Sequence, residues 1–327
     1  RAHLGGPQCR LGFHQGGVAL VSVLLIVAIL MAIASRLLAS HHLVINQNQN
    51  TFEQNQALQY ALGAEALAQQ ALIEDLTVSN DKSDHLEELW AKPIMPFELD
   101  EGGFLEAQLT DLNGCFNLNT VAGSDDEVAM ARFKTLAQLL GVQPQIAEMW
   151  KDWIDEDNEI TGFGAEDREY LIAQPPHRTP NQLVTHLSEL ALLSGIGKDQ
   201  LSTLSPLICL LPDADSLLNV NTANSHALAA LDPGLSLAIT EPIVAVPRNY
   251  ASVQEFIDAN PDFTAVAAAL SVSSDYFLLH AQAQVGSSTV TLQSMLHRNP
   301  SNGQVKILSR DLGKLFRSNL SINTEEA

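Results

Sequence analysis

The chain has 327 residues, enough for two domains or for one domain with a large insertion. Lys and Arg total 17 against 38 Asp and Glu, and the resulting formal charge of −21 repels phosphate backbones and disfavours nucleic acid as a partner. Hydrophobic residues make up 46% and charged residues 17%, which excludes a disordered chain and a many-pass membrane protein.

A long apolar run follows the first residues. Residues 18–34 contain one polar side chain, that of Ser22. Extended to residue 38, the run would reach about 30 Å as a helix, enough to cross a bilayer core. Two arginines precede it and no acidic residue occurs before Glu53, so the positive-inside rule puts the N-terminus in the cytoplasm. We predict one transmembrane segment at 18–38, with the body of the chain outside the cytoplasm.

The helical pattern continues beyond the apolar run. Leu58, Leu62 and Ala66 recur at four-residue spacing, which predicts an amphipathic helix. We therefore expect one helix over about 18–75, whose second half, 39–75, packs an Ala/Leu face on a soluble domain.

Two stretches alternate apolar and polar residues, as strands do. In residues 104–119 a turn sequence at 111–114 predicts a β-hairpin. Residues 274–310 alternate again, with turns at 286–287 and 299–303. These strands should complete the same sheet.

The stretch between the strand regions, about 125–270, has helical periodicity. Phe133, Leu136, Leu139 and Leu140 form one apolar face, and Gly141 ends that helix. The predicted organisation is therefore a sheet domain made from 76–124 and 271–327, interrupted by a helical domain at 125–270.

Two segments of the helical stretch, 187–204 and 218–239, are similar to helix-hairpin-helix units with a short Gly turn. Such units bind DNA when basic residues surround the hairpin. Here the first has only Lys198, and the second has no basic residue before Arg248. Packing is the favoured role, and a membrane-anchored DNA-binding or DNA-uptake protein is the alternative.

The residues before the apolar run carry a resemblance. Gly16 and Gly17 stand directly before a long apolar helix with a positively charged leader ahead, which resembles the processing site of type IV prepilins. The resemblance implies a leader at 1–17, cleavage by prepilin peptidase after Gly17, and Val18 as the new N-terminus. The alternative is a plain signal anchor in which the glycines form a loop.

The fifth residue from Val18 is Ser22, where most type IV pilin-like proteins have Glu. A missing Glu is a mark of the K-type minor pseudopilins of type II secretion systems. The string D-x-N-G-x-x-N-L-N at 111–119 and W-I-D-x-D…G-A-E-D-x-x-Y at 153–170 are similar to strings of the same family. The resemblance covers about 17–310.

The resemblance implies an α+β, type IV pilin-like fold: a long N-terminal helix, half transmembrane and half periplasmic, packed on a small antiparallel sheet, with a large all-α insertion domain. It also implies a non-enzymatic tip subunit in the Gram-negative inner membrane that starts the pseudopilus and supports protein export. The implied partners are the I- and J-type minor pseudopilins, the major pseudopilin and prepilin peptidase, with no nucleic acid. Processing and methylation are the implied modifications.

An acidic loop follows the predicted helix that ends near Ile154. Aligned to the EF-hand pattern, Asp155, Asp157 and Glu159 fall at positions one, three and five, and Glu166 falls at position twelve. The pattern fails at position six, which is not Gly. A calcium loop of another shape is one interpretation, since its carboxylates repel one another unless a cation neutralises them. The other is a solvated acidic loop that caps the next helix.

The K-type resemblance favours calcium. It implies one or two structural calcium ions, with Glu166 as bidentate ligand and Asp155 and Asp157 as monodentate ligands. Glu159 and Asp167 are further candidates.

Three cysteines occur. Cys9 lies in the expected leader, which leaves Cys115 and Cys209. In an oxidising periplasm two remaining cysteines often pair, and closing a loop of about 95 residues could stabilise the fold by about 3–5 kcal/mol. We expect a Cys115–Cys209 disulfide, with two unconnected buried thiols as the alternative.

Sequence motifs of catalysis are missing. The chain has no G-x-S-x-G, H-E-x-x-H or P-loop, and no G-x-G-x-x-G followed by a suitable acid. A membrane-anchored hydrolase with a catalytic metal in the acidic loop would need a ligand set that favours zinc or manganese. We predict no catalysis.

Overall fold

The computed structural model describes residues 16–78, 82–99 and 103–313, without the side chains of 16–18, 78 and 94–96. Residues 1–15 of the expected leader, including Cys9, and residues 314–327 of the expected sheet domain lie outside this description. The chain divides into two compact units, one ending at Gln56 and one beginning at Ala57. Each unit is described by itself.

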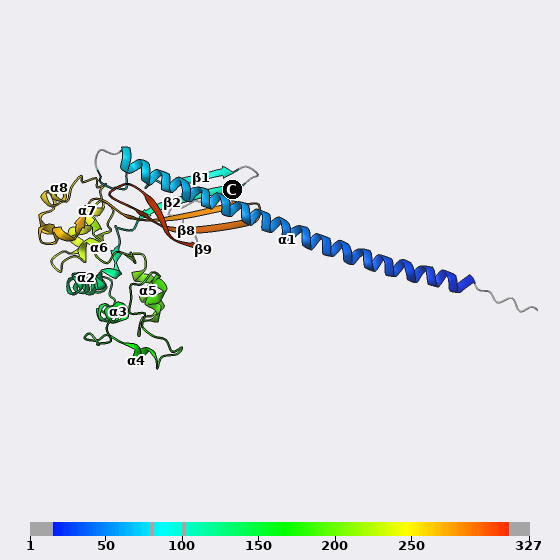
Figure 1. Ribbon diagram of the computed structural model, residues 1–327, viewed down its shortest axis with the longest axis horizontal. Coiled ribbons are helices and arrows are strands. Elements are labelled where there is room, and N and C mark those ends of the chain that lie inside the picture. Colours follow the sequence, from blue (N-terminus) through cyan, green and yellow to red (C-terminus); the bar gives the residue numbers. More distant parts are fainter. Residues whose placement is uncertain (1–15, 79–81, 100–102, 314–327) are drawn as a thin grey trace, which may run out of the picture. The chain divides into compact units, whose positions relative to one another are not determined.

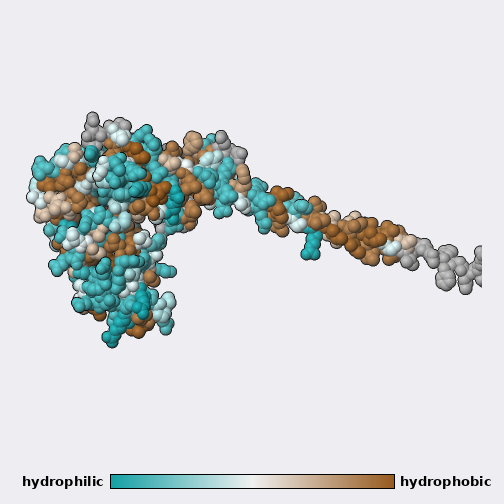
Figure 2. Space-filling model, in the orientation of Figure 1, coloured by the Kyte–Doolittle hydropathy of each residue, from teal (hydrophilic) through white to brown (hydrophobic). Residues whose placement is uncertain are grey.

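The first unit holds the N-terminal part of a single helix, α1, which runs from Gly16 to Val78. The large apolar side chains between Leu20 and Ile33 are 40–66% exposed, and they give this part of the helix the brown surface in Figure 2. Within the described residues, α1 is the one helix long and apolar enough to cross a membrane. The Ser22 hydroxyl donates to the backbone oxygen of Ala19 at 2.9 Å, so this polar group is satisfied inside the helix.

The second unit contains a five-stranded antiparallel sheet (Figure 1). Its strand order is β1-β2-β7-β8-β9. The strands are β1 (Ile94–Leu99), β2 (Gly103–Asp111), β7 (Tyr276–Val285), β8 (Ser288–Arg298) and β9 (Val305–Leu312). The predicted turns after β7 and after β8 are confirmed, and each contains a glycine of positive φ, Gly286 and Gly303. The neighbours β2 and β7 enclose the whole insertion.

The C-terminal part of α1 packs on this sheet through small side chains. The buried stripe of the helix consists of Ala57, Ala61, Ala64, Ala68 and Leu72, at most 4% exposed. Alanine lets the helix lie close to the inward-facing side chains of β2, β7 and β8.

The contact face lies beside the three residues whose spacing predicts the helix. Leu58 and Leu62 are half-buried beside the stripe, and Ala66 is exposed. The four-residue spacing was read correctly as helical. The predicted Ala/Leu face is confirmed, but its centre consists of the alanines and Leu72, and Leu58 and Leu62 lie at its margin.

The predicted hairpin at 104–119 is also wrong. β2 pairs with β1 and β7, whereas the residues after the turn form the short strand β3 (Phe116–Asn117), which pairs in parallel with β4 (Ile208–Cys209). The backbone N–H of Leu112 still bonds to Tyr276 of β7 at 2.9 Å, so the chain leaves the sheet only after β2 is complete. The turn directs the chain into the insertion.

The insertion is helical apart from short strands. Besides β3 and β4, a second parallel pair joins β5 (Leu218–Asn219) to β6 (Leu270–Ser271). Its helices are η1 (Leu118–Ala122), α2 (Asp126–Leu139), α3 (Ile146–Ile154), α4 (Asp167–Tyr170), η2 (Leu187–Leu192), α5 (Lys198–Leu204), α6 (Ser225–Ala229), α7 (Leu237–Val244), α8 (Val253–Ala259) and η3 (Pro261–Ala269). They share one apolar core, separate from the core between α1 and the sheet.

Candidate metal centre

Aromatic packing fixes the ends of the acidic loop. Trp150 and Trp153 of α3 are buried, and Trp150 donates its indole N–H to the backbone oxygen of Leu118 at 2.9 Å. The ring of Trp153 meets that of Tyr170 of α4 edge-on, with centroids 5.0 Å apart. The loop therefore begins at the end of α3 and closes at the start of α4.

Three of the predicted ligands come together in this loop. One carboxylate oxygen from each of Asp155, Asp157 and Glu166 lies within 4.8 Å of the others. Glu166 is 4% exposed, and neither of its side-chain oxygens has a hydrogen-bond partner among the described residues. The same holds for Oδ1 of Asp155. Buried oxygens without partners are costly, and a cation bound here would offset that cost.

The electrostatics of the group agree with this geometry. Burial, followed by repulsion from Asp152 and Asp155, raises the pKa of Glu166 to about 7. Burial and the charges of Asp157 and Asp152 raise the pKa of Asp155 to about 6. Each carboxylate opposes ionisation of the next, and a bound cation would reverse that effect.

Asp152 is a member of this neighbourhood that the sequence analysis missed. It is fully buried, and both of its carboxylate oxygens accept from the Thr161 N–H, at 3.1 and 3.2 Å. A Cβ added at Gly164 would overlap the Asp152 carboxylate, so that glycine lets the loop backbone lie against it. The spacing held a signal, since Asp152 lies three residues before Asp155 and thus on the same side of α3.

The structure does not bring Glu159 and Asp167 into the group. Glu159 is exposed, and it takes part through its backbone N–H, which donates to Asp157 Oδ1 at 2.7 Å. The Asp167 carboxylate accepts from Arg178 Nη1 and from the backbone N–H of Thr179, both at 3.0 Å. Its charge is therefore paired with Arg178, which follows α4 in the chain, and not with the other loop carboxylates.

The donor set fits calcium. It consists of hard carboxylate oxygens, without His or Cys, which suits Ca²⁺ and does not favour zinc. A second acidic group, Asp75, Asp84 and Glu88, lies elsewhere in the unit. Arg298 bonds to Asp75 at 3.0 Å and also to Asp84, so a cation of the protein already occupies that group.

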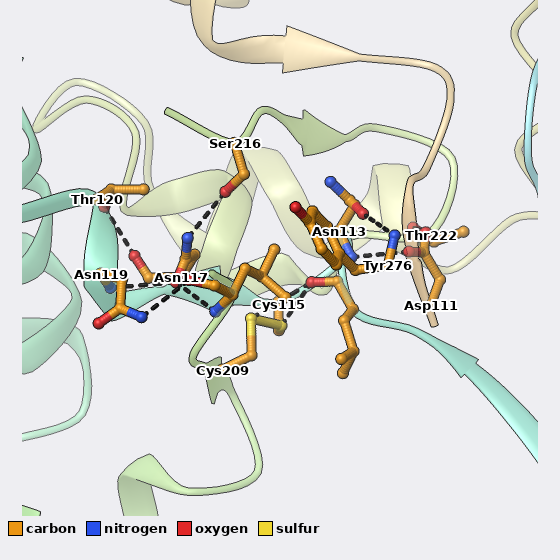
Figure 3. Close-up of a disulfide and its surroundings, with 12 residues drawn as sticks. Asp111, Asn113, Cys115, Asn117, Asn119, Thr120, Cys209, Ser216, Thr222 and Tyr276 are labelled. Atoms are coloured by element: carbon orange, nitrogen blue, oxygen red, sulfur yellow. Dashed lines mark hydrogen bonds between the residues drawn. A yellow bond between two sulfur atoms is a disulfide. The ribbon is translucent and has the colours of Figure 1, made fainter. Parts of the chain in front are cut away.

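A disulfide connects the start of the insertion to β4. Cys115 and Cys209 are bonded, with Cα atoms 5.9 Å apart and a sequence separation of 94 (Figure 3). In the chain-entropy model, closing a loop of that length stabilises by about 4–5 kcal/mol. Cys115 lies in the turn after β2, and Cys209 lies in β4, the strand that follows α5. The bond therefore holds the segment that enters the insertion against β4.

Asparagines on either side of the disulfide extend this connection. Asn113 Oδ1 accepts from the backbone N–H of Tyr276 at 3.0 Å, and Asn117 Nδ2 donates to Ser216 Oγ at 2.9 Å (Figure 3). Asn119 Nδ2 donates to the backbone oxygen of Leu211 at 2.8 Å. The D-x-N-G-x-x-N-L-N string thus joins the sheet to the insertion through side-chain amides.

These features define a pilin-like protein. A long helix, apolar over its N-terminal part, packs its C-terminal part on an antiparallel sheet, and a helical domain is inserted between β2 and β7. A family model described as type II secretion system, protein K, matches residues 114–213.

Relatives and a solved structure agree with that match. Type II secretion system protein K from Pseudomonas aeruginosa is 33% identical over 323 residues, which cover 92% of this chain and 93% of that protein. The protein of that name from Klebsiella pneumoniae is 32% identical over 305 residues, covering 87% and 93%. A chain in the crystal structure of the GspK-GspI-GspJ complex from enterotoxigenic Escherichia coli superposes with a TM-score of 0.73 at 29% identity, covering 82% of this chain and 100% of that one.

The chain belongs to the type II secretion system protein K family. It is a minor pseudopilin and a component of protein transport. The comparisons give no support to the DNA-binding alternative.

Proposed function

We propose that this chain is the tip subunit of a pseudopilus and assembles there with I- and J-type minor pseudopilins. The likeness to a chain solved in the GspK-GspI-GspJ complex carries the proposal, because it spans all of that chain. The subunit acts as a structural part, without catalysis, and the major pseudopilin adds beneath it.

The proposed processing and membrane anchoring involve α1. Prepilin peptidase cleaves after Gly17, and the helix from Val18 then holds the subunit in the Gram-negative inner membrane with its body in the periplasm. Support comes from the exposed apolar surface of α1 and from the arginines ahead of it. Methylation belongs to the same processing step.

Calcium in the acidic loop is the second part of the proposal. Asp155, Asp157 and Glu166 would hold the ion, whose charge would offset the mutual repulsion of the carboxylates. The unpartnered oxygens of Glu166 and Asp155 support this assignment. The role is structural, since the loop connects α3 to α4 and so fixes that end of the helical domain.

Assembly can be tested by co-purification. The full chain, expressed with I- and J-type minor pseudopilins and extracted in detergent, should elute with both in one complex. A strain that lacks its own K-type subunit should regain secretion when the chain is supplied. Failure of both results would contradict the proposed function.

Calcium can be tested on the same full chain by calorimetry in detergent after chelation. We expect saturable binding that Glu166→Gln weakens at least about tenfold, since one carboxylate is lost from the group. Glu159→Gln is the matched control, because Glu159 lies in the same loop outside the group, and it should leave the affinity unchanged. Equal calcium affinities in both variants would show that calcium does not bind in this loop.

A further inference from the structure

A cleft lies in the helical domain, and none of its lining residues belongs to the acidic loop. It consists of two adjoining hollows with volumes of about 250 Å³ and about 60 Å³. They share Thr120 of η1, Arg132 of α2, Ser216 in the segment before β5, and Ala269 of η3. Four separate segments thus form one continuous recess.

Arg132 is the cation that both hollows share. Its Nε donates to the backbone oxygen of Leu231 at 3.1 Å, which fixes the plane of the guanidinium. Its two Nη groups have no hydrogen-bond or ion-pair partner among the described residues, although Asp125 and Asp232 are near enough to act on its charge. A half-buried guanidinium with two free nitrogens suits a carboxylate, which accepts from both at once.

A hydroxyl donor stands beside the guanidinium. Ser216 Oγ accepts from Asn117 Nδ2 at 2.9 Å, and its own proton has no acceptor in the described part of the chain. Together with Arg132 it presents donors to the shared part of the cleft. An anionic group with several oxygens can accept hydrogen bonds from both of these side chains.

The two hollows differ in character on either side of these donors. The larger is lined by the exposed carboxylates of Asp125 and Asp215. Asp215 Oδ1 accepts from the backbone N–H and hydroxyl of Ser124, both at 2.8 Å, and these bonds hold the side chain in place. The smaller hollow is lined by Phe116, Leu218 and Leu231. A ligand would therefore find acceptors for an ammonium group on one side and an apolar recess on the other.

We propose that this cleft binds an aliphatic α-amino acid. Its carboxylate bonds to Arg132 and Ser216, its ammonium group faces Asp125 and Asp215, and its side chain enters the smaller hollow. The zwitterion matches the cleft better than a simple anion does, because two carboxylates at the rim and a chain charge of −21 repel a ligand that carries only negative charge.

The test uses the full chain in detergent micelles with L-leucine as the probe. Saturation-transfer NMR or calorimetry should show saturable binding at a Kd of about 1 mM or below, within reach of a small ligand held by one bidentate pair. N-acetyl-L-leucine lacks the ammonium group and L-leucinamide lacks the carboxylate. Each should bind at least about tenfold more weakly.

Variants assign the binding to the cleft. Arg132→Gln should weaken L-leucine at least about tenfold and leave L-leucinamide unchanged, since that analogue makes no carboxylate contact. Arg178→Gln, at an exposed arginine outside the cleft, is the matched control and should change nothing. The analogues are compared on the unaltered chain. They therefore test recognition of the carboxylate and ammonium groups even if Arg132→Gln is unstable. No saturation up to about 10 mM, or equal binding of leucine and leucinamide, would overturn the proposal.

Discussion

At the scale of single residues, the acidic loop contains buried carboxylate oxygens that have no hydrogen-bond partner among the described residues. Glu166 and Asp155 have oxygens that no described group bonds, whereas the neighbouring Asp167 accepts hydrogen bonds from Arg178 and Thr179. A loop needed only to cap α4 could leave Glu166 in solvent. Its burial beside Asp157 favours a cation site over a solvated acidic loop.

This burial predicts how stability depends on pH in the calcium-free chain. The folded pKa values of Glu166 and Asp155, about 7 and about 6, exceed the ordinary values of 4.5 and 3.8. Between these limits the folded state holds protons that the unfolded chain releases, so the free energy of unfolding falls as pH rises from about 4 to 7. We expect a loss of about 1–3 kcal/mol over that window, measured by urea unfolding with chelator present.

The matched variants isolate the contribution of the loop, because other buried acids such as Asp84 shift in the same direction. Glu166→Gln should flatten the pH profile relative to the unaltered chain, and Glu159→Gln should not. A pH profile of the same slope in all three proteins would contradict the assigned burial of Glu166.

Spacing along the chain revealed part of this loop. Asp155, Asp157 and Glu166 follow a calcium-loop pattern that requires only sequence order. Asp167 is part of the W-I-D-x-D…G-A-E-D-x-x-Y string, but its side chain bonds to Arg178, a contact that depends on the path of the chain after α4. Asp152 was missed because its role depends on Gly164 lying against it, which is a matter of loop conformation.

At the scale of elements, the fit of α1 to the sheet depends on small side chains. Ala64 is fully buried against the sheet, and Ala66, two residues further along the same helix, is exposed. We predict that Ala64→Leu lowers the free energy of unfolding by about 1–3 kcal/mol, because the larger side chain has no space at this close approach. Ala66→Leu should change it by less than about 0.5 kcal/mol.

Urea unfolding of the full chain in detergent, followed by circular dichroism, measures both changes. Equal effects at the two positions would mean that the helix does not lie on the sheet through its alanine stripe.

The elements themselves were largely predictable, and their pairing was not. The alternation of apolar and polar residues predicts β7 and β8 with both turns, and the apolar run predicts the N-terminal part of α1. The string at 111–119 was misread because a turn sequence does not say where the following strand pairs. Leu112 stays bonded to Tyr276 and Phe116 pairs with β4, contacts to residues more than 90 positions away. Such long-range pairing leaves no local signal.

At the scale of the whole molecule, Ser22 bears on where the subunit stands in the filament. It is the fifth residue of the expected mature chain. Ser22 satisfies its hydroxyl within α1 by donating to Ala19, so it needs no partner from a neighbouring subunit. A Glu there would carry a charge into the hydrocarbon, at a cost of about 2.5–3.5 kcal/mol unless another group pairs with it. A tip subunit has no subunit above it whose assembly requires that charge.

We therefore predict that Ser22→Glu lowers secretion or leaves it unchanged and never raises it. The measurement is the amount of exported protein in the medium of a strain whose own K-type subunit is replaced by the variant. Ser40→Glu makes the same change in the same helix beyond the apolar run, and it should leave secretion and membrane insertion at the level of the unaltered chain. Secretion above that level with Ser22→Glu would mean that the position benefits from a paired acid. The subunit would then lie within the filament, beneath another pseudopilin.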